Sequence, residues 1–330
     1  MTTVDVLLIS RASLRYRQEL VEREPPLTKA FEISPGIHLA AVKEDIARPV
    51  FYGCKFRDLE PGGDAVLYGF VRYNPPGRRW DEDQAISKAL YLSHFIHAHE
   101  GGFEFAARIE TDEGDRLIKV EPAHIVPPFA RAYPCAGVER RWLRQAEAEE
   151  LRNLIIAYDA ARDYLKDKRV GMAVSLFSES PFIFHGRPRA ALLAAALEGL
   201  VSTSAERAFK QFTVRVPALA AEVGLPQFDK AWAERMYKLR SKLAHGVPLL
   251  QAVDDEEIRR RRGDLETAMT EMDEILRQLL KRALLDRTFA ERIQNAETHW
   301  PVAGKGCPAC RAQNPNLIDI QCPTCGARWQ

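Results

Sequence analysis

About half of the chain, from residue 138 to residue 297, consists of long segments in which apolar residues recur every three to four positions. This period places the apolar side chains on one face of an α-helix, and that face must be covered by other helices. The segments span residues 139–165, 171–179, 189–201, 204–223, 228–246 and 264–285. Ser204 and Asp229 are typical helix N-caps, and Gly224 and Gly246 are typical helix ends. The sequence therefore predicts an all-α helical bundle here.

The first 132 residues have a different pattern, in which short apolar runs are separated by turn residues. Such runs predict β-strands, and a helix is predicted at 88–98, capped by Asp81 or Asp83. The predicted strands span residues 4–9, 37–42, 50–56, 65–73, 103–110 and 116–121. Residues 1–132 are therefore expected to form an α+β domain, whose role would be to sense a ligand or to recognise a partner.

Four cysteines lie in the last thirty residues, with the spacing C-x2-C-x11-C-x2-C. They are Cys307, Cys310, Cys322 and Cys325. Two residues between cysteines allow a tight turn to direct both thiolates at one ion, and four thiolates complete a closed tetrahedral Zn²⁺ site. The segments CPAC and CPTCG resemble the knuckles of zinc ribbons, so residues 300–330 are predicted to form a small zinc ribbon with a structural Zn²⁺. A pair of redox disulfides is the alternative.

Charge and hydropathy limit where the protein works and what it binds. The chain has 47 basic and 46 acidic residues, a net charge of +1, so a nucleic-acid surface would have to be a local patch. The N-terminal apolar run is short and interrupted by Asp5, unlike a signal peptide, and no run has the length of a membrane span. We expect a cytoplasmic protein with no membrane partner.

The segment YKLRSKLAHG, residues 237–246, ends a predicted helix and contains Arg240 and His245 with four residues between them. Arginines are so frequent in this chain that about two or three such pairs are expected by chance, and a second pair joins Arg292 to His299. The pattern alone therefore does not distinguish a catalytic pair from a surface arginine followed by a histidine that ends a helix.

The context of the first pair is more informative. Residues 191–247, from the alanine-rich helix to the helix ending in RSKLAHG, resemble the Apea-like branch of the HEPN superfamily. The resemblance implies an all-helical ribonuclease domain, in which Arg240 and His245 match the R-x4-6-H motif and Glu198 matches an acidic position on an earlier helix. It also implies a homodimer, an RNA substrate such as tRNA, and a role in phage defence or as a toxin. Ser241 departs from the amide or acid often found after the arginine.

The chemistry of RNA cleavage is consistent with this pair. Cleavage without a metal needs a base for the 2′-hydroxyl proton, an acid for the leaving oxygen and a cation near the phosphate. A histidine in the last helical turn lies at the negative end of the helix dipole, a position that suits a proton donor. Positions five apart on an ideal helix differ by about 140 degrees, so the two side chains share a face only if the helix ends or distorts, unless a second chain completes the site.

Other interpretations remain open. Glu198 would also serve as the partner of a core arginine, and the bundle and ribbon would also suit a non-catalytic scaffold that binds RNA or protein. A third interpretation is a regulator that an unknown ligand or protein activates through the first domain. The basic run at 259–262 indicates a solvated helix face, and His94, His97 and His99 have a spacing open to metal binding but no evident fourth ligand.

Overall fold

In the computed structural model of the protein, the described residues are 2–11, 30–34, 36–42, 67–73, 84–98, 101–112, 117–123, 143, 145–166, 168–183, 185–202, 208–245 and 255–294. The chain divides into two compact units. The first comprises Met1–Asp159 and Pro181–Phe184, and the second comprises Ala160–Ser180 and His185–Gln330.

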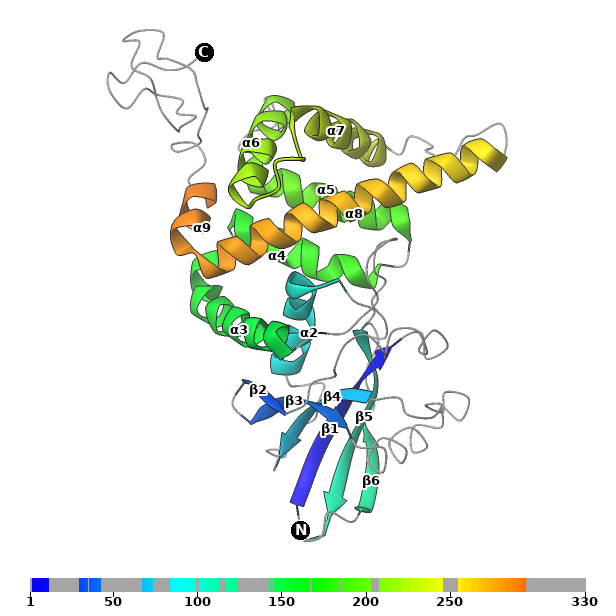
Figure 1. Cartoon of the computed structure of the whole chain (residues 1–330), viewed down its shortest axis with the longest axis vertical. Coiled ribbons are helices and arrows are strands. Elements are labelled where there is room, and N and C mark those ends of the chain that lie inside the picture. The colour runs from blue at the N-terminus through cyan, green and yellow to red at the C-terminus, as the bar shows by residue number, and fades with distance from the viewer. Residues whose placement is uncertain are drawn as a thin grey trace. The chain divides into compact units, whose positions relative to one another are not determined.

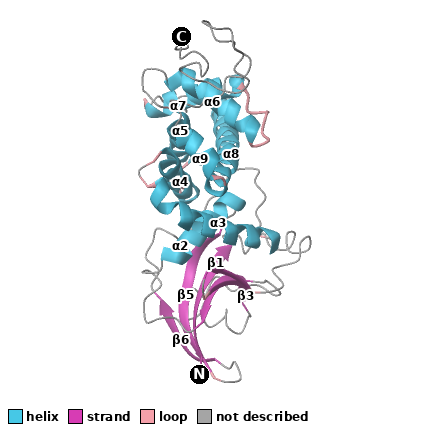
Figure 2. Ribbon diagram, turned by 90° about the vertical axis from the view of Figure 1, so that its left-hand side faces the viewer, coloured by secondary structure: helices cyan, strands magenta, loops and turns pink. Residues whose placement is uncertain are grey.

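The first unit contains a twisted six-stranded sheet in which every pair of neighbours is antiparallel (Figure 2). In spatial order its strands are β2 (Phe31–Ser34), β3 (Ile37–Val42), β4 (Leu67–Tyr73), β1 (Thr2–Arg11), β5 (Gly101–Thr111) and β6 (Leu117–Ala123). All but β2 lie on segments whose alternation predicts a strand. The four residues of β2 are too few for an alternation to be recognised.

Helix α2 (Gln84–Ile96) also belongs to the first unit. Its fully buried side chains include Ala89, Leu90 and Phe95, and Leu39 of β3 is buried as well. The sheet and the helix give the first unit the α+β content that was predicted, and both bury apolar side chains. The strand predicted at residues 50–56 lies outside the described residues.

The second unit is an all-helical bundle, which confirms the prediction of helices in this half of the chain. The helices are α4 (Arg169–Glu179), α5 (Gly186–Val201), α6 (Ala208–Glu222), α7 (Lys230–Ala244), α8 (Asp255–Leu285) and α9 (Arg287–Gln294). Helix α3 (Gln145–Leu165) begins in the first unit and ends in the second. The predicted segment begins at position 139, whereas the helix begins at Gln145, and Leu143 is not helical. None of the helices that the structure describes has the length and apolar character of a membrane span.

Helix α5 occupies the middle of the bundle and packs against α4, α6, α7 and α8 (Figure 1). Its alanines Ala190, Ala194 and Ala196 are fully buried, and their small side chains let neighbouring helices approach closely. Leu193 and Leu197 fill the remaining space of the core. A helix covered on so many sides holds its two ends in fixed positions, and Glu198 lies in its last turn.

The turn between α6 and α7 follows the predicted end and start signals. Gly224 adopts φ +80°, the left-handed conformation that ends many helices, and Leu225 N donates to Ala220 O at 2.9 Å. Asp229 then caps α7, because its carboxylate accepts a hydrogen bond from Trp232 N at 2.8 Å. Both predictions are confirmed, whereas Ser204 and Gly246 lie outside the described residues.

A single residue, Asp286, separates α8 from α9. Its carboxylate accepts hydrogen bonds from Phe289 N at 3.1 Å and from Arg282 Nε at 3.0 Å. The first of these caps α9, so that Phe289 and Ile293 are buried. The Phe289 N–H, and after it the Arg282 guanidinium, hold the pKa of Asp286 below its usual 3.8.

This cap leads to a stability prediction. Changing Asp286 to alanine is expected to lower the free energy of unfolding by about 1 kcal/mol, the usual cost of losing an N-cap. Because the folded pKa is depressed, the stabilisation by the charged form is complete above pH 3.8 and is lost as the pH falls through the folded value. Denaturant unfolding at several pH values measures both effects.

The control is Asp286→Asn, which keeps a capping oxygen without a titratable charge. The asparagine variant is expected to lie between the parent and the alanine variant at neutral pH. Its deficit relative to the parent is expected to shrink below pH 3.8. A deficit that does not change with pH would show that the charge of Asp286 contributes nothing to stability.

Candidate functional site

Helix α7 is fixed in the bundle by its apolar face. Trp232, Ala233 and Met236 are buried, and Trp232 Nε1 donates a hydrogen bond to Glu271 Oε2 of α8 at 2.9 Å. A large ring that is both buried and hydrogen-bonded fixes the rotation of the helix about its axis. The rotation in turn determines which of the later α7 residues reach the neighbouring helices.

Arg240, about two turns after Trp232 on α7, contacts α5. Its Nε donates to Glu198 Oε2 at 2.5 Å, a contact between residues 42 positions apart. The two side chains are 33% and 15% exposed, so the ion pair lies at the edge of the core with one side toward solvent. Among the residues that the structure describes, Glu198 is the one hydrogen-bond partner of this guanidinium, which leaves both Nη groups able to donate to a bound anion.

An aromatic cluster lies beside the ion pair. The Arg240 guanidinium carbon is 5.9 Å from the centre of the Tyr237 ring, within the range of a cation–π contact. Tyr237 contacts the edges of two α6 rings, Phe209 at 5.2 Å and Phe212 at 5.6 Å between centroids. Phe212 is buried, whereas Phe209 is 46% exposed. Arg240 is therefore held by a carboxylate and is flanked by a ring.

His245 is the C-cap residue of α7. Its backbone N–H donates to Ser241 O at 3.0 Å, and its side chain is exposed. The helix is continuous as far as Ala244, so His245 lies about 140 degrees around the axis from Arg240. The structure thus brings Glu198 and Arg240 together, and within the described residues it shows no contact between His245 and either of them.

This arrangement suits phosphate chemistry but leaves it incomplete within one chain. A part-exposed guanidinium whose Nη groups have no partner among the described residues suits a phosphate ligand, and the carboxylate on Nε fixes its plane. An exposed imidazole at a helix end is able to transfer a proton. A single copy, however, presents the two groups on different sides of α7.

In the second arginine–histidine pair of the sequence, the arginine has a structural role. Arg292 of α9 forms an ion pair with Glu222 at the end of α6 and lies over the Phe289 ring at 5.2 Å. It therefore ties two helices of the bundle together. His299 lies outside the described residues.

The cysteines predicted to bind zinc all belong to the last thirty residues of the chain. Cys307, Cys310, Cys322 and Cys325 lie outside the described residues, as does His99. His94 is buried in α2, with its ring 5.5 Å from Phe182 in an edge-to-face contact. In the described portion of the chain, no group of three or more histidine, cysteine, aspartate or glutamate side chains is arranged to hold a metal ion.

The basic run near the start of α8 is solvated, as its pattern indicates. Arg259, Arg260 and Arg262 are exposed, and Arg260 pairs with Asp264 one turn later at 3.8 Å.

Burial, and after it the carboxylate of Glu291, raises the pKa of Tyr164 where α3 meets α9. Neither feature contacts Arg240 or Glu198.

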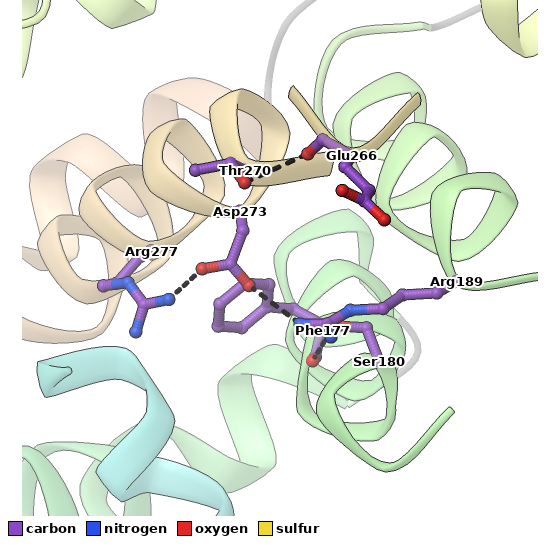
Figure 3. A network of polar contacts seen from close by, with 7 residues as sticks. All are labelled: Phe177, Ser180, Arg189, Glu266, Thr270, Asp273 and Arg277. Carbon is purple, nitrogen blue, oxygen red and sulfur yellow. Dashed lines mark hydrogen bonds and ion pairs between the residues drawn. The ribbon is translucent and has the colours of Figure 1, made fainter. Parts of the chain in front are cut away.

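A buried charge cluster in the bundle core was missed by the sequence analysis. Asp273 of α8 lies between two guanidinium groups, Arg277 one turn later and Arg189 of α5 at 3.6 Å (Figure 3). The three side chains are at most 9% exposed, and Arg277 lies 5.8 Å from the Phe177 ring. One signal was present in the sequence: Asp273 occupies the apolar stripe of α8 together with Met269, Leu276 and Leu280, where a charge requires a partner.

Comparisons of the chain with protein-family models, with curated proteins and with solved structures gave no match. The function is therefore inferred from the residues and their geometry.

Proposed function

We propose that the protein is a metal-independent endoribonuclease of the HEPN type that cuts RNA through attack by the 2′-hydroxyl. The observation that supports this most is the 2.5 Å contact between Arg240 and Glu198, two residues that the family resemblance selects from different helices. Arg240 lies on α7, the same helix that is capped by the exposed His245. The substrate would be RNA such as tRNA, and the setting would be phage defence or toxicity.

Each residue of the site has a distinct role in this proposal. Arg240 stabilises the negative charge that builds on the scissile phosphate, through its Nη groups. Glu198 accepts from Nε and thereby orients the guanidinium, which makes it a positioning residue. His245 transfers a proton, to the leaving oxygen or from the 2′-hydroxyl.

The position of His245 favours a dimeric site. Because α7 is continuous to Ala244, Arg240 and His245 of one chain diverge around the helix. A twofold axis beside α7 would place two copies of the motif face to face, so that two histidines share the tasks of acid and base. We propose that the bundle forms a homodimer through the helices around Arg240.

Incubation of the purified protein with total cellular RNA, with and without a chelator, tests the proposed activity. New ends are expected to carry 2′,3′-cyclic phosphate and 5′-hydroxyl groups, in amounts that do not depend on added Mg²⁺. Cleavage that leaves 5′-phosphate ends and requires Mg²⁺ would refute the proposal, because such products come from attack by water or hydroxide.

The C-terminal cysteines carry a separate prediction. The purified protein is expected to hold about one Zn²⁺ per chain, in a closed site of four thiolates that stabilises residues 300–330. Changing Cys322 to serine is expected to release the metal and unfold the ribbon alone, because the bundle has its own core. Metal analysis and thermal unfolding measure the two effects.

The control for this experiment is the same substitution at Cys54, which lies outside the four-cysteine pattern. Cys54→Ser is expected to retain the metal. Zinc-free protein after purification under reducing conditions, or cooperative loss of the whole fold in the Cys322 variant, would contradict the prediction.

A non-catalytic scaffold is the second candidate function. The observation in its favour is that His245 is exposed and makes no described contact with the Arg240–Glu198 pair. In that case the bundle would only dimerise, and the ribbon would bind RNA or protein. RNA that is bound by the parent protein but never cut would support this function.

A further inference from the structure

Helix α6 exposes an aromatic ring next to the candidate site. Phe209 lies on the face of α6 that carries the buried residues Phe212 and Val216, yet 46% of it is exposed. Among the residues whose burial the structure describes, it is the only aromatic side chain with such exposure. Its ring is thus about half covered by the bundle and in contact with a second ring.

The Phe209–Tyr237 pair adjoins Arg240 of the candidate site. On an ideal helix Tyr237 is about 60 degrees from Arg240 in one direction and about 80 degrees from His245 in the other. The ring of Tyr237 thus lies between the two motif positions around α7, and Phe209 contacts that ring at 5.2 Å. Tyr237 in turn lies 5.9 Å from the Arg240 guanidinium carbon, so the two rings are continuous with the candidate site.

The charges around the rings suit a polyanion. Lys210 follows Phe209 on α6, and Lys238 and Lys242 lie on the solvent side of α7. All three are exposed, and none forms an ion pair with a residue that the structure describes. Two carboxylates of the described residues near these helices are already engaged, because Glu198 of α5 binds Arg240 and Glu234 of α7 pairs with Lys230 at 3.9 Å.

We infer that Phe209 and Tyr237 form a stacking platform for an unpaired base of single-stranded RNA, beside the phosphate that Arg240 holds. The identity of that phosphate rests on the proposed function, whereas the platform itself rests on the rings and lysines. Stacking on aromatic rings requires a base that is not already stacked within a duplex, which selects loops and single strands. Rings flanked by cations are the common means of binding such strands.

A second copy of the chain is a less suitable occupant. The cores of protein–protein interfaces are depleted in lysine, because burying an unpaired ammonium group costs free energy. Three exposed lysines on the two helices that carry the rings therefore favour a phosphate backbone over a protein surface. The proposed dimer would use other residues near Arg240, with the rings open to the cleft.

Binding of a 2′-O-methyl oligoadenylate tests the platform independently of catalysis, because this RNA has no 2′-hydroxyl to attack. Measured by fluorescence anisotropy on the full chain, Phe209→Ala is expected to bind roughly tenfold more weakly than the parent, in line with the loss of one stacked base. Phe209→Leu keeps the apolar packing and is expected to lose a similar factor, and Phe209→Trp is expected to retain binding. The matched control is Met172→Ala on α4, whose side chain is 60% exposed and carries no ring.

Two further measurements separate the possible outcomes. If the parent cuts RNA, Phe209→Leu is expected to raise KM roughly tenfold with little change in kcat, since the ring contacts RNA away from the reacting atoms. If the parent cuts nothing but its binding still depends on the Phe209 ring, the proposed nuclease function fails and the platform stands.

The proposal is overturned if Phe209→Leu and Phe209→Ala bind like the parent. It is also overturned if the light-scattering mass falls when the ring is removed, because Phe209 would then belong to a contact between copies. Equal affinity for the oligoadenylate as a single strand and within a duplex would equally exclude stacking of an unpaired base.

Discussion

Changing His245 to alanine is expected to lower the rate of RNA cleavage by about 10²- to 10⁴-fold, the usual effect of removing a positioned proton-transfer group. The fold is expected to be unaffected, because the imidazole is exposed and the backbone N–H of this residue keeps its bond to Ser241 O. Single-turnover cleavage of a defined RNA, with circular dichroism of the same sample, measures both. Any toxicity of the parent protein in cells is expected to disappear with the activity.

Arg240→Ala is expected to be comparably inactive, since it removes the cation beside the phosphate. Its matched control is Arg235→Ala, an exposed arginine of the same helix, which is expected to cut like the parent. Glu198→Gln leaves an oxygen that accepts from Nε and is expected to retain more activity than Glu198→Ala. This order of the two activities is expected only if Glu198 acts by orienting Arg240.

The contrary outcomes are equally definite. His299→Ala, in the other arginine–histidine pair, is expected to cut normally. Should His245→Ala cut RNA as well as the parent does, His245 simply ends helix α7, and the scaffold function takes precedence.

The second large effect concerns stability. Asp273→Ala removes the carboxylate that both Arg189 and Arg277 contact inside the bundle (Figure 3). Breaking a buried ion pair by removing one partner typically destabilises a protein by about 3–5 kcal/mol, because the charges that remain stay desolvated. A fall of this size in the free energy of unfolding is expected, measured by denaturant titration.

Two comparisons define the cause of that loss. Asp264→Ala breaks an exposed ion pair on the same helix, in which the side chains are 64% and 69% exposed, and is expected to change stability little. Replacing all three charges of the cluster by apolar residues of similar volume is expected to cost far less than Asp273→Ala alone. If Asp273→Ala were no worse than Asp264→Ala, the cluster would not be held by its charges.

The change at Asp273 is also expected to disturb the geometry of the candidate site. Arg189 and Glu198 lie on the same helix, about two and a half turns apart. A bundle in which α5 is no longer fixed against α8 would present Glu198 to Arg240 less regularly. Partial loss of cleavage in Asp273→Asn, with intact binding of a non-cleavable RNA, would be the sign of this indirect effect.

The sequence by itself determined the helices of the second unit and several of their ends. Asp229 and Gly224 act locally, through a side-chain oxygen on a nearby N–H and through a left-handed backbone, so their positions in the sequence were sufficient. The apolar period of α7 and α8 is likewise a local property. The predicted segment 264–285 ends where α8 ends, but the cap at Asp286 and helix α9 were not predicted, because eight residues are too few for the apolar period of α9 to be recognised.

Only the tertiary structure decided which distant residues meet. The contact of Arg240 with Glu198 spans 42 residues and depends on how Trp232 fixes the rotation of α7 and how the bundle surrounds α5. Helix α5 is covered on many sides, so its sequence shows no strong polar face. The burial of Arg189 could therefore not be recognised from the spacing of the apolar residues. The exposure of Phe209 was hidden for the opposite reason: it lies on the apolar stripe of α6, and only the packing shows that its neighbours leave the ring half uncovered.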